Sequence, residues 1–289
     1  MESLRGEFQV TMMCRLLEVS RSGFYAWLKR PVSDRAQRRE LVGEAVEAVY
    51  FGFKKRYGAP RITVELNEQG VECCVNHVAK LLKEKKLRAR NGKGFKYCAR
   101  IESKTNVSDN LLSRQFEVGE PNQKWVSDIT YIKVGRIWLY LAVVLDLFSR
   151  KVIGWALDSH MREELVLEAF TMAVSSRDIQ ADILLHSDRG VQYRGHEYQT
   201  ALRSHGVRCS MSRKGNCWDN AAMESFFSRL KVELIYAENF KSIEDARAGI
   251  FEYIELFYNR VRRHSAIGYV SPNVYEQKFN NLDVSTVRG

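Results

Sequence analysis

The run of nine apolar residues from Ile137 to Leu145 is the feature that most restricts the fold of this chain. Nine residues are too few to cross a bilayer, which needs about 20, but they suit a strand that is buried on both faces. Gly135 precedes the run and Asp146 follows it, and both residue types favour turns. The sequence therefore predicts a sheet with a strand that has no solvent-facing side.

Further strands and helices are predicted around this run. Alternating apolar and polar residues predict a strand over Val126–Val134, and another strand is expected over Lys151–Leu157. The remaining predictions are helices over residues 163–174, 197–205, 220–236 and 242–260, with short buried strands over 183–185 and 207–211. Three strands in hairpin order, followed by helices that alternate with strands, give an α/β domain with a mixed sheet.

The first part of the chain is predicted to be helical. Helices over residues 10–17 and 21–30 enclose a short turn, and Ser20 can cap the second one. Two short helices around a tight turn form a helix-turn-helix, whose second helix would offer Arg21 and Ser22 to DNA. An ordinary helical hairpin would give the same pattern.

A second helical region follows and resembles the first in pattern. Its helices are predicted over residues 38–51, 62–69 and 77–86. Asn76 is expected to cap the last helix, whose outer face carries Lys80 and Lys83, and Arg61 precedes the middle helix. Solvated lysines are the ordinary interpretation, but so much charge on three helices favours DNA contact.

The net charge of +10 on 289 residues is unevenly distributed. Residues 1–120 hold 23 Lys and Arg against 15 Asp and Glu, whereas residues 121–289 hold 22 against 20. A basic surface favours a polyanionic partner, most often nucleic acid. The opening residues lack the apolar core of a signal peptide, and the six cysteines show no zinc-binding spacing. We therefore expect a cytoplasmic, DNA-binding protein with no membrane partner and no structural zinc.

Three acids are conspicuous by their positions: Asp128 within a predicted strand, Asp188 directly after a buried one, and Glu224 one turn into a helix. A buried carboxylate needs a partner, and divalent cations such as Mg²⁺ take oxygen ligands. Three converging carboxylates can hold two Mg²⁺ ions roughly 3.5–4 Å apart, which assist phosphoryl transfer. From spacing alone, a turn acid at Asp188 and a solvated acid at Glu224 stay open.

Several longer sequence motifs resemble those of a known family. They are R-L-L-E-V-S-R-S-G-F-Y-A-W at 15–27, W-V-S-D-I-T-Y at 125–131, D-L-F-S-R-K-V-I-G-W at 146–155, H-S-D-R-G-V-Q-Y at 186–193, D-N-A-A-M-E-S-F-F-S-R-L-K-V-E at 219–233 and Y-N-R-V-R-R-H-S-A-I-G-Y-V-S-P at 258–272. With the 35 residues between Asp188 and Glu224, they resemble the OrfB-type transposases of bacterial insertion sequences, which share a core with DDE transposases and retroviral integrases.

The resemblance implies a ribonuclease-H-like core in which Asp128, Asp188 and Glu224 bind two Mg²⁺ or Mn²⁺ ions. It implies a transposase that cuts the ends of its element and transfers a 3′-OH to another phosphodiester. Lys231 resembles a residue that contacts terminal DNA, although a solvated lysine stays open. His186 is expected to pack or hydrogen-bond, and Asp146 to be a turn acid near Arg150.

The resemblance also suggests partners and divisions of the chain. The expected partners are the terminal inverted repeats, target DNA, further copies of the chain and a first-frame (OrfA-type) product. The predicted parts are a helix-turn-helix segment (1–33), a second helical DNA-binding domain (34–90), a linker (91–120), a ribonuclease-H-like integrase core (121–275) and a tail (276–289), with Pro272 after the last helix.

Two other functions stay open. One is a DNA-binding regulator without catalysis, which the intact set of three acids disfavours. The other is a nuclease of the same fold that only hydrolyses DNA. The two DNA-binding segments disfavour it, because general hydrolysis needs no sequence readout.

Overall fold

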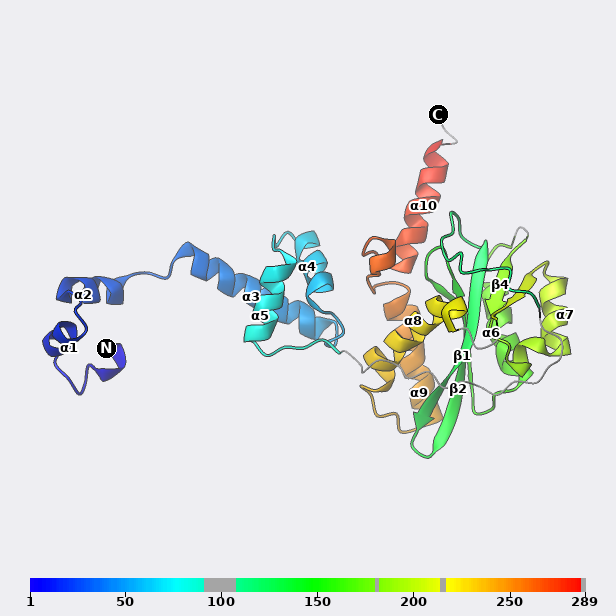
Figure 1. The fold of residues 1–289 in the computed structure, drawn as a ribbon, viewed down its shortest axis with the longest axis horizontal. Helices are drawn as coiled ribbons and strands as arrows, with labels where there is room; N and C mark the ends of the chain where they lie inside the picture. Colours follow the sequence, from blue (N-terminus) through cyan, green and yellow to red (C-terminus); the bar gives the residue numbers. More distant parts are fainter. Residues whose placement is uncertain (91–107, 180–181, 214–216, 287–289) are drawn as a thin grey trace. The chain divides into compact units, whose positions relative to one another are not determined.

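The computed structural model describes residues 1–90, 108–179, 182–213 and 217–286 (Figure 1). The chain forms two compact units, residues 1–87 and 88–289. Most of the predicted linker, residues 91–107, lies outside the described residues.

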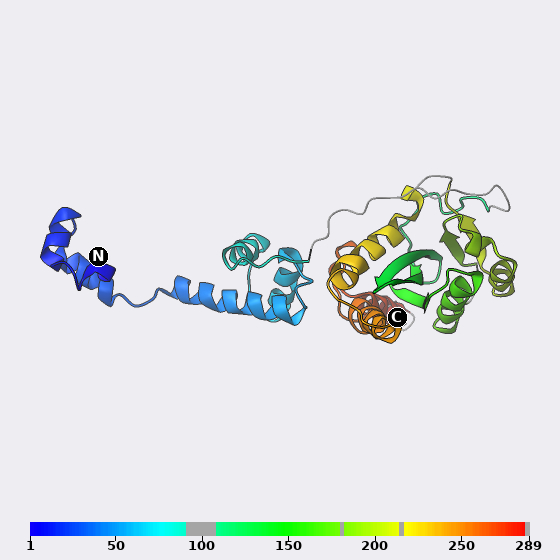
Figure 2. The same cartoon turned by 90° about the horizontal axis from the view of Figure 1, so that it is seen from below.

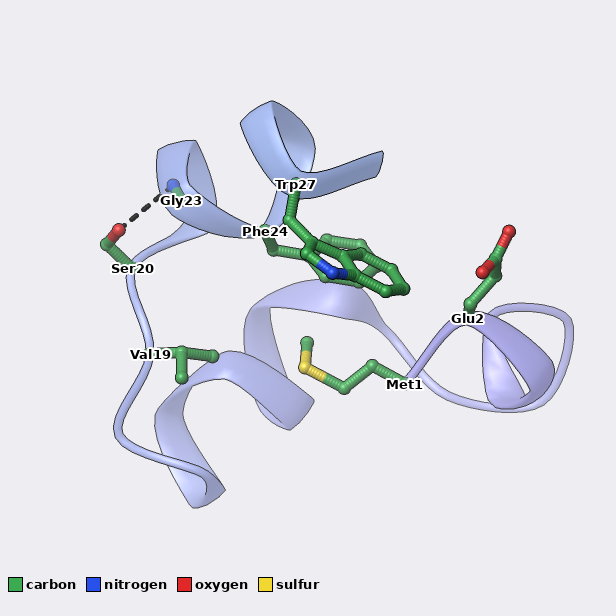
Figure 3. Close-up of a pocket in the computed structure, with 7 residues that line it drawn as sticks. All are labelled: Met1, Glu2, Val19, Ser20, Gly23, Phe24 and Trp27. Carbon is green, nitrogen blue, oxygen red and sulfur yellow. Dashed lines mark hydrogen bonds between the residues drawn. The ribbon is translucent and has the colours of Figure 1, made fainter. Parts of the chain in front are cut away.

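The first unit opens with two short helices, α1 (Val10–Leu16) and α2 (Arg21–Lys29). Ser20 caps α2 as predicted, because its hydroxyl accepts a hydrogen bond of 3.0 Å from the Gly23 amide (Figure 3). Phe24 is buried, whereas Leu16 and Trp27 are 83% and 54% exposed. Two helices this short meet along a narrow strip, so much of their apolar surface stays in solvent. Trp27 instead borders a shallow apolar hollow (Figure 3).

Three helices form the rest of this unit: α3 (Asp34–Gly52), α4 (Ala59–Glu68) and α5 (Val75–Glu84). Their apolar faces meet in a core that includes Val46, Ile62, Leu66, Val78 and Leu81. The N-cap of α5 is Cys74, so the prediction that Asn76 caps this helix is wrong. The Cys73 amide donates a 2.9 Å hydrogen bond to Asn67, which sets the preceding turn and lets the helix begin earlier.

The second unit is built on a five-stranded mixed sheet with the order β3-β2-β1-β4-β5. Its strands are β1 (Lys124–Val134), β2 (Ile137–Asp146), β3 (Val152–Asp158), β4 (Leu184–Ser187) and β5 (Arg208–Met211). The first three pair antiparallel, while β4 is parallel to β1 and to β5. Most of β2 is buried, but Ile137 and Trp138 at its start are exposed.

Helices cover both faces of this sheet, as Figure 2 shows. On one face α6 (Glu163–Ser175) and α7 (His196–Ser204) enclose an apolar core with Trp125 and Phe170. On the other face α8 (Ala221–Leu230) packs against β1, and α9 (Ile243–Phe251) follows. Both helices continue into π-helical turns, over Lys231–Ile235 and Glu252–Tyr258.

The last helix, α10, spans Pro272–Thr286, so the prediction that Pro272 follows the final helix is wrong. A proline fits the first turn of a helix because its missing amide would have no partner there. Glu276 attaches α10 to the sheet, since its carboxylate accepts hydrogen bonds from Ser149 at 2.7 Å, Arg177 at 2.6 Å and Lys151 at 3.2 Å. These contacts join residues more than 90 positions apart, which local sequence patterns do not reveal.

Candidate active site

The sheet places Asp128 and Asp188 side by side. Val126 of β1 is the register partner of His186 on the parallel strand β4. Asp128 lies two residues further along β1, and Asp188 directly follows Ser187, the last residue of β4. The parallel pairing therefore brings the part of β1 that carries Asp128 beside the strand end from which Asp188 follows.

Tyr193 interacts electrostatically with both carboxylates. Its hydroxyl is fully buried and shares a hydrogen bond of 3.0 Å with the Ser127 hydroxyl. Burial raises the pKa of Tyr193 well above its usual value, and the charges of Asp128 and Asp188 raise it further. Both acids therefore act on the same buried phenol, as expected if they converge.

Close packing shapes the loop that follows Asp188. The Asp188 carboxylate accepts a 2.8 Å hydrogen bond from the Gly190 amide. A Cβ atom at Gly190 would lie 2.9 Å from Asp188 Oδ1 and 3.0 Å from Gln192 Oε1. Glycine at this position thus allows the backbone to approach the carboxylate closely.

Glu224 lies in the first turn of α8 and is exposed, although partial burial of its carboxylate raises its pKa. The start of α8 is attached to β1, because the Asn220 side chain donates a 3.3 Å hydrogen bond to the Ser127 carbonyl. Among the residues that the structure describes, no three Asp, Glu, His or Cys side chains are grouped closely enough to hold a metal ion. The fold thus brings Asp128 and Asp188 together and places Glu224 on the helix beside them, outside such a cluster.

Lys231 is buried, with only 7% of the residue exposed. Burial lowers its pKa, while the charge of Asp128 raises it. The alternative of a solvated lysine therefore does not hold. Instead, Lys231 begins the π-helical turn after α8, and its ammonium group interacts electrostatically with Asp128.

A buried ion pair lies just beyond Lys231 and was not foreseen from the sequence. Arg262 donates two hydrogen bonds to the Glu233 carboxylate, at 2.8 and 2.7 Å, and Tyr253 donates a third at 2.9 Å. The only signal was that Glu233 and Arg262 both lie in family-like sequence words. The pair joins the end of α8 to the segment after α9.

His186 hydrogen-bonds within the core, which confirms the prediction. Its Nδ1 and Nε2 atoms lie 2.8 Å and 3.0 Å from the hydroxyls of Ser210 and Ser212. Burial lowers its pKa to about 4, which favours the neutral ring. Asp146 is also fully buried, and burial raises its pKa to about 6. Its carboxylate accepts hydrogen bonds from the backbone amides of Asn122 and Phe148, and its carbonyl accepts one from the Arg150 amide at 2.8 Å. Asp146 is thus the turn acid near Arg150 that was predicted, and it is buried.

Apart from Lys231, the residues predicted to bind DNA lie in the first unit and differ in their exposure. Arg21, Ser22, Lys80 and Lys83 are exposed on α2 and α5. Arg61 is half-buried, and its guanidinium lies over the Tyr57 ring at 5.8 Å from the centroid.

Comparisons with known proteins agree with this arrangement. Residues 119–217 and 205–272 match the integrase core domain, and residues 36–94 match an HTH-like domain. The chain is 46% identical to the transposase InsF of insertion sequence IS3A from Escherichia coli strain K12, over 96% of this chain and 97% of the relative. This chain belongs to the IS3 family of transposases. A 31 kDa protein of insertion element IS600 from Shigella sonnei is 38% identical, over 93% of this chain and 99% of that protein.

Two retroviral structures were also found. One is the simian T-cell lymphotropic virus intasome in complex with a PP2A regulatory subunit, at 15% identity and a TM-score of 0.46, covering 80% of this chain and 74% of that one. The other is the magnesium complex of the HTLV-2 integrase catalytic core, at 17% identity and a TM-score of 0.41, covering 54% of this chain and 97% of that one.

As an IS3-family transposase, the chain is a DDE-type enzyme that acts on DNA. Its mixed sheet with helices on both faces is the predicted ribonuclease-H-like core, and the helical first unit contains the HTH-like domain. Within the described ranges, no helix has the length and apolar character needed to cross a membrane.

Proposed function

We propose that this transposase cleaves the ends of an insertion sequence and transfers the freed 3′-OH to another phosphodiester by two-metal phosphoryl transfer. Asp128, Asp188 and Glu224 would be the metal ligands. The observation that carries this proposal is the parallel pairing of β1, which carries Asp128, with β4, which Asp188 directly follows, together with the action of both charges on Tyr193.

The donor set suits Mg²⁺ or Mn²⁺. Carboxylate oxygens are the ligands that these hard cations prefer, and both aspartates act electrostatically on the same buried Tyr193. Glu224 stands on α8, which packs against β1, and would be the third ligand. When bound, the metal ions would supply positive charge to the attacking and leaving oxygens.

The surrounding residues would hold these ligands in place. The Gly190 amide orients the Asp188 carboxylate, and the buried pair of Tyr193 and Ser127 supports the strand that carries Asp128. Lys231, beside Asp128, would offset negative charge and contact a phosphate of the bound end.

The first unit would recognise the terminal repeats. Its exposed Arg21, Ser22, Lys80 and Lys83 would contact DNA, and Arg61 would contribute from its position beside Tyr57. Base contacts would set sequence preference, and lysine–phosphate contacts would add salt-dependent affinity. We further propose that the enzyme acts in the bacterial cytoplasm as an oligomer on DNA, together with a first-frame product.

Incubation of the purified protein with labelled element ends and Mg²⁺ tests the proposal. Joined products are the expected result. Cleavage without joining would instead indicate a nuclease, and a mobility shift without any chemistry would indicate a regulator.

A further inference from the structure

A buried carboxylate at the entrance to α8 receives hydrogen bonds from separate parts of the chain. Asp219 has no exposed surface. Its Oδ2 atom accepts hydrogen bonds from the Asn110 side chain at 2.8 Å and from the Arg213 amide at 3.0 Å and Nε at 3.1 Å. Its Oδ1 atom accepts from Arg114 at 3.0 Å and from Arg213 Nη2 at 3.0 Å.

These donors keep Asp219 ionised. The hydrogen bond from Arg213 is the main reason that its pKa lies far below the usual value, and Arg114 contributes. Both arginine side chains are about half exposed, at 55% and 46%. The Asp219 carboxylate is thus buried, while the two arginines that neutralise it reach the surface. Removal of its negative charge would leave several hydrogen-bond donors without an acceptor.

Asp219 is five residues before Glu224, at the start of the same helical segment. Its neighbour Asn220 donates a hydrogen bond to the Ser127 carbonyl, one residue before Asp128. The two adjacent residues therefore connect the entrance of α8 to β1 and to the segment of residues 110–114. Because a helix transmits the position of its first turn, these contacts set where Glu224 stands relative to Asp128.

The segment of residues 110–114 is also attached to the part of the sheet that leads to Asp188. The Ser210 hydroxyl accepts hydrogen bonds from the amides of Leu111 at 2.9 Å and Leu112 at 3.2 Å. Ser210 also hydrogen-bonds His186, two residues before Asp188. Residues 110–114 thus bridge the strand that leads to one proposed ligand and the helix that carries another.

We propose that Asp219 is a positioning residue that holds α8 so that Glu224 can complete the metal site with Asp128 and Asp188. The inference rests on the proposed function, because it takes these three acids as the ligands. Asp219 itself is not a ligand, since its oxygens face guanidinium and amide donors that a cation would have to displace.

The test is Asp219→Asn, which keeps the size of the side chain but removes its charge. We expect Mn²⁺ binding, measured by calorimetry on the full-length protein without DNA, to weaken about tenfold. The Mg²⁺ concentration for half-maximal cleavage should rise in parallel, while end binding without metal stays unchanged. The matched control is Glu276→Gln, which disrupts another buried ion cluster far along the chain and should lower the melting temperature without changing Mn²⁺ affinity.

Unchanged Mn²⁺ affinity in folded Asp219→Asn would overturn the inference, because the residue would then serve only stability. If that variant does not fold, Arg213→Ala replaces it, since the carboxylate keeps Arg114 and Asn110. A threefold loss of Mn²⁺ affinity would support the inference, and no loss would overturn it. Failure of the proposed function is separate: it would be seen as Mn²⁺ binding that survives in Asp128→Ala and Glu224→Ala.

Discussion

At the scale of single residues, the three acids should be indispensable for chemistry and dispensable for folding. We expect Asp128→Ala, Asp188→Ala and Glu224→Ala each to abolish strand cleavage and joining. Removal of one preorganised electrostatic group already costs roughly 10²–10³ in rate, and loss of a metal ligand should cost at least as much. Cleavage with Mg²⁺ and circular dichroism are the measurements. Near-wild-type cleavage by any of these variants would remove that residue from the proposed site.

Lys231 requires a variant suited to its burial. Lys231→Met keeps most of the aliphatic stem and removes the charge that interacts with Asp128. If the ammonium group contacts a phosphate, the plot of the logarithm of the end-binding constant against the logarithm of the salt concentration should become less steep by roughly 1. Joining should also slow. Binding titrations at several salt concentrations measure the slope. Lys133→Met, at an exposed lysine on β1, is the control; identical slopes and joining rates for wild type and Lys231→Met would contradict the role.

At the scale of elements, the loop after β4 depends on Gly190. We expect Gly190→Ala to move the Asp188 carboxylate, because the new Cβ would lie 2.9 Å from its Oδ1 atom. Overpacking of this kind costs typically about 1–3 kcal/mol, and cleavage should fall with it. Gly119→Ala is the matched control, since a Cβ there meets nothing within 4 Å. Equal cleavage by the two variants would show that the loop tolerates a methyl group.

The junction of β2 with α6 and α10 should be sensitive to pH through Asp146. Its folded pKa of about 6 exceeds the ordinary 3.8 mainly because of burial and in spite of Arg177. Because its folded pKa is raised, the Asp146 carboxyl contributes its full stabilisation below pH 3.8, and this stabilisation is lost as the pH rises through 6. Nearby Glu276 has a lowered pKa, so its contribution is lost at lower pH instead.

We therefore expect the free energy of unfolding of Asp146→Asn, relative to that of wild type, to increase by up to about 3 kcal/mol as the pH rises from 4 to 7. Denaturant unfolding of both proteins across this range measures the difference. A constant difference would mean that Asp146 ionises normally in the folded protein.

At the scale of the whole molecule, the two units should divide binding from chemistry. We expect a fragment of residues 88–289 to lose the preference for terminal repeats over random duplex, because the predicted base-reading helices belong to the first unit. This fragment keeps Asn110 and Arg114, the partners of Asp219. Competition binding with both DNAs measures the preference, and full discrimination by the fragment would contradict the assignment.

Much of this protein was predictable from its sequence because the signals are local. The apolar run after Gly135 predicted β2, alternation predicted β1, and Ser20 was correctly identified as a helix cap. The three acids were identified by their places in strands and helices, together with the resemblance to transposases. The parallel pairing of β1 with β4, which brings these parts of the chain together, was found only in the structure.

Only the tertiary structure decided which side chains are buried and what they contact. Lys231, for which a solvated position had stayed open, is buried and interacts electrostatically with Asp128. Pro272 begins a helix that Glu276 attaches to Arg177, just after α6. Asp219 looked like an ordinary residue at a helix start, yet its partners Asn110 and Arg114 lie more than 100 residues away. Periodicity describes one element at a time, whereas such contacts depend on how distant elements pack, so the sequence alone could not reveal them.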